Sequence, residues 1–181
     1  MPHTHNGSMF ERYSHRARCL IFMALWSARR RGGLYIEPED LLHALIREDR
    51  GEFAAISAEV FPGSAAPDEF SAGDHRPFFS DGVARTLLRE LHEDPNPLGR
   101  ETPGEKREPV PHVDMPVSRS LKEVLALVAK ARQDDTRTIE PLDLLAGIVE
   151  NRDSRLAQLL RDSGITRQAV TKALDSGSLG D

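Results

Sequence analysis

The residue types that carry most catalytic and metal chemistry are present but scattered along the chain. Seven histidines occur in 181 residues, and their one close pair is His3-x-His5 near the N-terminus. Two imidazoles alone do not complete a zinc site, so we interpret the pair as a chance spacing. The single cysteine, Cys19, has no neighbouring base that would activate it as a nucleophile, and we interpret it as a half-buried packing thiol. We therefore expect no catalytic residues, no metal site and no cofactor.

One segment has the glycine spacing of a phosphate-binding loop. Gly99 and Gly104 are separated as in that motif, but Glu105 stands where the motif requires lysine. The segment is rich in proline and follows no predicted strand. These features exclude a nucleotide site of this class, and the sequence predicts a protein that is not an enzyme.

The net charge and the hydropathy of the chain exclude some classes of binding partner. The net charge of −5 argues against sequence-independent binding to nucleic acid. One basic run, Arg29–Arg31, is typical of a helix C-terminus, where cations complement the helix dipole. No apolar run approaches the roughly 20 residues of a membrane-spanning helix, no signal peptide is visible, and a single cysteine fits a reducing compartment. We expect a cytoplasmic protein without nucleic-acid or membrane partners.

The chain contains one motif twice. Residues 36–46 read Ile-Glu-Pro-Glu-Asp-Leu-Leu-His-Ala-Leu-Ile, and residues 139–149 read Ile-Glu-Pro-Leu-Asp-Leu-Leu-Ala-Gly-Ile-Val, at an offset of 103. Six of the eleven positions are identical. Repeats of about 50 residues usually stack to build binding surfaces rather than enclosed catalytic pockets.

Cap residues and apolar spacing predict helices in both copies. In the first copy Ser14 can cap a helix that Gly32 ends, and Pro38 suits the first position of the next helix. The expected helices are 14–31, 38–50, 52–60 and 80–93 in the first copy, and 118–133 (or from Ser120), 141–150, 153–163 and 166–175 in the second. Apolar residues spaced three and four apart predict the buried face of each helix. These faces are Ala17, Leu20, Ile21, Ala24, Leu25 and Ala28 in the first helix, Leu41, Leu42, Leu45 and Ile46 in the second, and Leu144, Leu145, Ile148 and Val149 in the helix over 141–150. No alternating strand pattern occurs, so the fold class is all-α, with two four-helix halves.

Proline and glycine mark the boundaries between these units. Residues 61–79 are expected to form a loop within the first copy, and residues 94–116, which hold six of the twelve prolines, are expected to link the copies. Residues 1–8 form an N-terminal extension, 9–93 the first repeat, 117–176 the second and 177–181 a tail. Glu48-Asp49 and Asp134-Asp135 are interpreted as solvated turn residues.

Three motifs together resemble the N-terminal domain of Clp ATPases of the ClpC type. They are Met9–Tyr13 (Met-Phe-Glu-Arg-Tyr) followed by Arg16-Ala17-Arg18, Tyr35–Leu42 (Tyr-Ile-Glu-Pro-Glu-Asp-Leu-Leu), and Pro116–Leu121 (Pro-Val-Ser-Arg-Ser-Leu). The resemblance covers about residues 9–60 and 116–175 and implies two tandem four-helix Clp repeats around a pseudo-twofold axis. The first helices of the two repeats correspond at an offset of 103 or 104, the latter if the turn at 134–137 is one residue shorter.

The resemblance also suggests binding positions. ClpC-type domains bind phosphorylated arginine through a glutamate in each repeat, which matches Glu39 in the first repeat but Leu142 in the second. The threonines beside these glutamates are Pro38 and Pro141 here, so recognition of a guanidinium is expected to be poor, and Glu39 is an ordinary acid at a helix start. Phe10 matches a residue at the family's cyclic-peptide surface, with Val117 as its partner position. Phe10 is equally well explained as a hydrophobic staple for the first helix.

We therefore assign Phe10, Arg12, Glu39 and Val117 as candidate protein-binding residues. The resemblance implies a stand-alone, non-enzymatic module that lacks the ATPase modules of the family. It would bind Clp ATPase or peptidase subunits, adaptor proteins or protein substrates as a monomer and modulate proteolysis, either as an accessory factor or as a decoy. The alternative is a stress-response or transcription-associated regulator that reuses the fold.

Overall fold

The computed structural model describes residues 11–52, 77–93, 115–133, 136–151 and 154–177. The helices in these ranges are α1 (His15–Arg30), α2 (Pro38–Asp49), α4 (Asp81–Glu93), α5 (Arg119–Ala131), α6 (Pro141–Glu150), α7 (Arg155–Asp162) and α8 (Arg167–Gly177). Each lies close to its expected position, so the all-α prediction is confirmed. The expected helix over 52–60, the extension 1–8 and most of segments 61–79 and 94–116 lie outside the described residues, and the domain boundaries stay predictions.

The helices begin where cap chemistry predicts. The Ser14 hydroxyl accepts the Ala17 amide at 3.2 Å, and the Ser118 hydroxyl accepts the Leu121 amide at 3.1 Å. Both α2 and α6 have proline at their first position and a capping box just before it. Gly32, with φ of +73°, follows the C-cap of α1 in the conformation that glycine adopts most readily.

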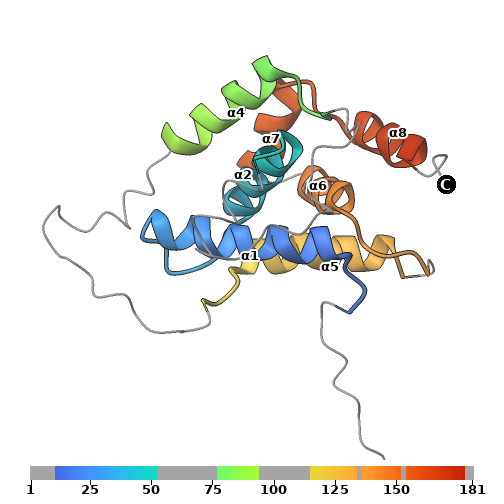
Figure 1. Ribbon diagram of the computed structural model, residues 1–181, viewed down its shortest axis with the longest axis horizontal. Coiled ribbons are helices and arrows are strands. Elements are labelled where there is room, and N and C mark those ends of the chain that lie inside the picture. The colour runs from blue at the N-terminus through green and yellow to red at the C-terminus, as the bar shows by residue number, and fades with distance from the viewer. Residues whose placement is uncertain (1–10, 53–76, 94–114, 134–135, 152–153, 178–181) are drawn as a thin grey trace, which may run out of the picture.

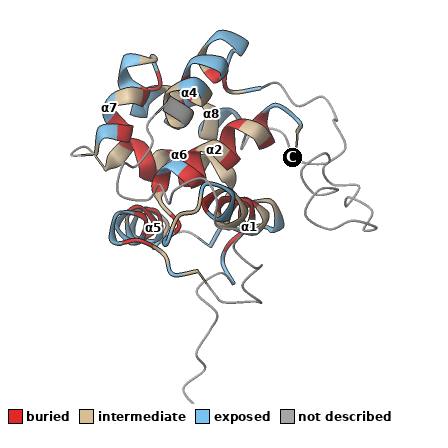
Figure 2. Cartoon of the chain, turned by 90° about the vertical axis from the view of Figure 1, so that its left-hand side faces the viewer, coloured by how far each residue is buried: buried red, intermediate tan, exposed pale blue. Residues whose placement is uncertain are grey.

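Helices α2 and α6 occupy the centre of the molecule. They pack on each other, α1 packs on α2, and α5 packs on α6. Figures 1 and 2 show α1 and α5 on one side of this central pair and α4, α7 and α8 on the other. The central pair is therefore covered on two sides, and the first helix of each repeat lies on the same side of it.

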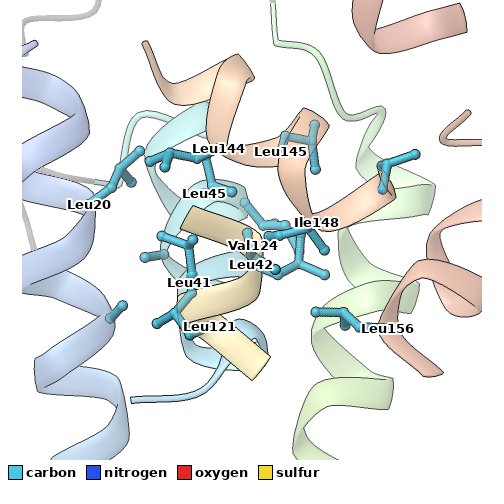
Figure 3. Close-up of a cluster of buried hydrophobic side chains, with 14 of the residues drawn as sticks. Leu20, Leu41, Leu42, Leu45, Leu121, Val124, Leu144, Leu145, Ile148 and Leu156 are labelled. Carbon is cyan, nitrogen blue, oxygen red and sulfur yellow. The ribbon is translucent and has the colours of Figure 1, made fainter. Parts of the chain in front are cut away.

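The core is made by the predicted leucine faces of the two central helices. Figure 3 shows Leu41, Leu42 and Leu45 of α2 beside Leu144, Leu145 and Ile148 of α6, and all six are buried. Burial of each such side chain stabilises the fold by roughly 1.5–3 kcal/mol. A Cβ at Gly147 would lie 2.5 Å from Val128 Cγ2, so glycine at this position lets α5 and α6 approach closely.

The first helix buries a slightly different set from the one expected. Ala17, Leu20, Ala24 and Ala28 are buried as predicted, but Ile21 and Leu25 are only half-buried. Met23 is 5% exposed and belongs to the core, although the apolar stripe read from the sequence omitted it. None of the helices in the described ranges is long and apolar enough to span a bilayer.

The interpretation of Glu48 and Asp49 as solvated residues is wrong, because both are buried. Asp49 accepts the backbone amides of Phe78 and Phe79 at 2.8 and 2.9 Å, which fixes the chain ahead of α4. Glu48 forms an ion pair with Arg16 of α1, and the Nε donates at 2.9 Å. Buried carboxylates are stable when they are paired or hydrogen-bonded in this way. Asp134-Asp135 lie outside the described residues.

The structure settles the register between the repeats. The N-caps Ser14 and Ser118 differ by 104, whereas Pro38 and Pro141 differ by 103. The offset of 104 between the first helices is therefore confirmed. Within the chain itself, α1 has 16 residues and α5 has 13, while the stretch that leads to α6 is longer than the one that leads to α2.

Candidate protein-binding surface

Two short backbone junctions tie each repeat to the other. In the first, Ile36 lies parallel to Val117: the Ile36 amide donates to the Pro116 carbonyl at 3.0 Å, and the Ser118 amide donates to the Ile36 carbonyl at 3.0 Å. We call it the 36–117 junction. It joins the residue before the cap of α2 to the residue before the cap of α5.

The second junction is the pseudo-symmetric counterpart of the first. Tyr13 lies parallel to Ile139: the Ser14 amide donates to the Ile139 carbonyl at 3.0 Å, and the Ile139 amide donates to the Arg12 carbonyl at 2.7 Å. We call it the 13–139 junction. Each repeat therefore contributes one segment to each junction, and the two halves are held together by exchanged backbone hydrogen bonds.

An ion pair with a buried aspartate lies beside each junction. Arg31, the C-cap of α1, donates to Asp40 from Nε at 2.8 Å and from an Nη atom at 2.7 Å, and this hydrogen bonding raises the pKa of Arg31. Arg132, the C-cap of α5, also donates to Asp143 from Nε, at 2.9 Å, and from an Nη atom, at 2.5 Å, but both bonds go to the same carboxylate oxygen. Such charge-assisted hydrogen bonds hold the guanidinium and the carboxylate in a fixed relative orientation.

The same two carboxylates close the capping boxes of the central helices. Asp40 accepts the amide of Glu37 at 2.9 Å, and Asp143 accepts the amide of Glu140 at 2.8 Å. Each aspartate thus connects the end of one helix, the start of the next and the adjacent junction. The sequence did not identify these two Arg–Asp pairs, because charged residues at helix ends are first interpreted as partners of the helix dipole.

The candidate residues fall at different junctions. Val117 is half-buried in the 36–117 junction, and Glu39 is exposed in the first turn of α2, three residues after Ile36. Arg12 is exposed at the 13–139 junction, where its side chain donates to the Arg132 carbonyl. Phe10 lies outside the described residues. The structure therefore brings Val117 and Glu39 to one junction and places Arg12 at the other.

Compared with protein-family models and with curated protein sequences, the chain matches none. Among solved structures it is similar to the N-terminal domain of the caseinolytic protease associated chaperone ClpD from Arabidopsis thaliana. The TM-score is 0.57 at 17% identity, over 94% of this chain and 99% of that one. The fold is that of a Clp N-terminal domain. At this identity the similarity shows the fold alone, and the closer ClpC-type assignment stays a prediction.

Within this Clp N-domain fold, Tyr13 is the pseudo-symmetric counterpart of Val117, and the pairing of Val117 with Phe10 stays a prediction because Phe10 lies outside the described residues. Tyr13 and Val117 both precede a serine N-cap at the offset of 104, and both lie in a junction. Tyr13 is buried, and its burial raises the pKa of its phenol. Val117 packs against the core as well. Both positions therefore support the scaffold, and Val117 offers only part of its side chain to a ligand.

The exposed positions beside the two junctions differ in chemistry. Glu39 has a pKa above its usual value because the surrounding protein desolvates the carboxyl, although the residue is exposed. Leu142, its counterpart, is half-buried and packs on the core. Tyr35 and Leu34 are 49% and 70% exposed, and their counterparts are Thr138 and Arg137. The surface beside the 36–117 junction thus carries an acidic residue, Glu39, and two exposed apolar residues, Leu34 and Tyr35, that have no counterparts of the same chemistry at the other junction.

The remaining chemistry of the described residues is sparse. Cys19 is half-buried and packs against the core, as expected for a packing thiol. The expectation that no base lies beside it is wrong, because its Sγ lies 3.7 Å from His15 Nε2, one helical turn away. In the part of the chain that the structure describes, no group of three His, Cys, Asp or Glu side chains lies together as a metal site would require.

Proposed function

We propose that this chain is a non-enzymatic protein-binding module of the Clp chaperone–protease system. It binds substrates, adaptors or Clp subunits over its two junctions and α1, and so modulates delivery to the protease. The observation that carries the proposal is the Clp N-domain fold with its two cross-tied junctions. A cytoplasmic monomer is part of this proposal.

The junctions suit protein binding for a physical reason. Their backbone is fixed by exchanged hydrogen bonds and by the two Arg–Asp pairs, so side chains such as Arg12 and Glu39 are held by a preorganised frame. A preorganised surface loses less conformational entropy when a partner binds. Exposed polar residues beside apolar ones also match the composition of transient protein interfaces.

Phosphoarginine is not the ligand that these junctions favour. A guanidinium-phosphate ligand shared by two equivalent sites would need an acid at each, and only Glu39 is present. Leu142 at the second position packs on the core instead. We therefore propose recognition of a protein surface rather than of this modified side chain.

Capture of partners from a cell lysate tests the proposal. The tagged chain is expected to recover Clp ATPase or peptidase subunits, as identified by mass spectrometry. A variant that combines Arg12→Glu with Glu39→Lys is expected to recover about tenfold less, since both exposed charges are reversed. A control that combines Lys122→Glu with Glu123→Lys on the exposed face of α5 has the same net charge and is expected to behave like the wild type.

Two results would overturn this function. One is recovery of a sigma factor or repressor without any Clp component, which would favour the regulatory alternative. The other is equal recovery of Clp subunits by the wild type and by the junction variant, provided that circular dichroism shows both to be folded.

A further inference from the structure

Helix α1 differs in charge from the other helices that the structure describes. It contains four arginines and no Asp or Glu, whereas each of the others contains at least one acidic residue. Arg16 is used internally in the ion pair with Glu48, and Arg18, Arg29 and Arg30 are exposed. Because the whole chain has a net charge of −5, this outer side of α1 is a local concentration of positive charge.

The exposed large apolar side chains of the described residues gather at the same element. They are Phe22 of α1, which is 40% exposed, and Leu34 and Tyr35 in the turn that follows α1. Trp26 is half-buried, and the Arg30 guanidinium lies over its ring at 4.7 Å from the centroid. An arginine held on an indole presents a flat, weakly hydrated cation beside an apolar surface.

These residues form one stripe along the helix. Arg18, Phe22, Trp26 and Arg30 follow one another at intervals of four residues, which places them on neighbouring turns of one face. We define the α1 outer face as these four residues together with Arg29. Its aromatic centre is flanked by arginine at both ends, and at 1.5 Å per residue it is about 18 Å long.

We propose that the α1 outer face docks an acidic amphipathic helix of a partner protein. This names the partner chemistry for the protein-binding role proposed above, and it rests on that role. Apolar side chains one turn apart on the partner pack on Phe22 and Trp26, as in other helix-docking interfaces. Carboxylates near the two ends of the partner helix pair with Arg18 at one end and with Arg29 or Arg30 at the other.

Charge complementarity selects this occupant over two others. Nucleic acid would meet the acidic remainder of the chain once it extended beyond α1, because the net charge is −5. A symmetric dimer through α1 would place the arginines of one copy against the same arginines of the other, since a twofold interface uses the same patch twice. An acidic helix is short enough to stay on α1, and its carboxylates attract the arginines, so neither kind of charge repulsion applies to it. Arginine and aromatic residues are also enriched at interface hot spots.

Fluorescence provides a direct assay, because Trp26 is the one tryptophan of the chain. The acidic probe is a synthetic helical peptide of about fourteen residues, with leucines one turn apart at its centre and glutamates at both ends. A neutral probe has glutamine in place of glutamate, and a basic probe has lysine. The acidic probe is expected to shift the Trp26 emission and to bind about tenfold more tightly than the neutral probe, and the difference shrinks as salt is raised.

Matched variants assign the binding to this face. Arg18→Glu combined with Arg29→Glu is expected to weaken the acidic probe at least about tenfold and to gain affinity for the basic probe. Lys122→Glu combined with Lys130→Glu makes the same charge change on α5, and it is expected to leave the affinity within about twofold of the wild type. Phe22→Ser tests the apolar part and is expected to weaken both the acidic and the neutral probe.

Several results would overturn the inference. Equal binding of the acidic and neutral probes would do so, as would unchanged binding by the Arg18→Glu, Arg29→Glu variant. A single-stranded oligonucleotide that binds this face when the acidic probe does not would assign it to nucleic acid. Sedimentation that shows an associated wild type and a monomeric double variant would assign it to self-association.

The two proposals can fail separately. If the lysate experiment recovers Clp subunits but the acidic probe does not bind, the protein-binding role stands and the partner chemistry is wrong. If the acidic probe binds with the expected arginine dependence but no Clp subunit is recovered, the docking face stands and its place in the Clp system is wrong.

Discussion

The 36–117 and 13–139 junctions use the same framework but present different surfaces. In both, the backbone hydrogen bonds, the serine and glutamate caps and the Arg–Asp pair are repeated. The exposed residues around them are not repeated: Glu39 is replaced by Leu142, and Tyr35 by Thr138. The two repeats therefore share the parts that hold the halves together and differ in the parts that would meet a partner.

Removal of the aspartate from each Arg–Asp pair should cause the largest losses of folding stability, and the two losses should differ in size. Asp143→Ala is expected to lower the free energy of unfolding by about 3–5 kcal/mol, because Arg132 is only 14% exposed and would lose its partner in a buried setting. Asp40→Ala is expected to cost less, about 1–3 kcal/mol, because Arg31 is 37% exposed and water can replace the carboxylate. Urea denaturation of the two variants measures both values. Equal losses would show that exposure does not distinguish the two pairs.

Asp49 makes a contact that is specific to the first repeat. At the offset of 103, the corresponding residue of the second repeat is Arg152, which is not acidic. Asp49→Ala is expected to lower the free energy of unfolding by about 2–3 kcal/mol, because the buried amide of Phe79 and the partly buried amide of Phe78 lose their acceptor. Hydrogen exchange should accelerate most in α4 and least in α5. Uniform acceleration along the chain would contradict a local anchoring role.

Replacement of Glu39 should change the folding stability least, and the raised pKa of Glu39 determines the sign of that change. Because the folded protein holds the proton more tightly than the unfolded chain, the ionised carboxylate slightly disfavours folding above the folded pKa, and this cost disappears as the pH falls below the usual glutamate value of about 4.5. Glu39→Gln is therefore expected to be slightly more stable than the wild type at neutral pH, with the difference lost in acid. Denaturation curves over this pH range measure it, and a difference that grows in acid would reverse the assignment.

The sequence predicted the parts of the fold that depend on local chemistry. Ser14, Pro38, Ser118 and Pro141 mark helix starts because cap and proline effects act within one turn. The leucine faces of α2 and α6 were predicted because a period of 3.6 residues is visible in the sequence. The duplicated motif predicted the all-α double repeat because its two copies carry the same helix start and the same apolar spacing.

The contacts that the sequence could not predict join residues far apart in the chain. The amides that bind Asp49 belong to residues about thirty positions away, so its burial left no local signal. The junctions pair segments about eighty to a hundred and thirty positions apart, and two isolated bridges produce no strand pattern. The face of α1 carrying Phe22 and Arg30 could be read as a stripe, but only the packed structure shows that it stays exposed.

Hydrogen exchange of the free chain and of its complex with a recovered Clp subunit tests whether α1 and the two junctions form the binding surface. We expect the partner to slow exchange in α1 and in the junction segments 12–14, 35–39 and 115–118. Slowed exchange confined to α7 and α8, with α1 and both junctions unchanged, would contradict this assignment.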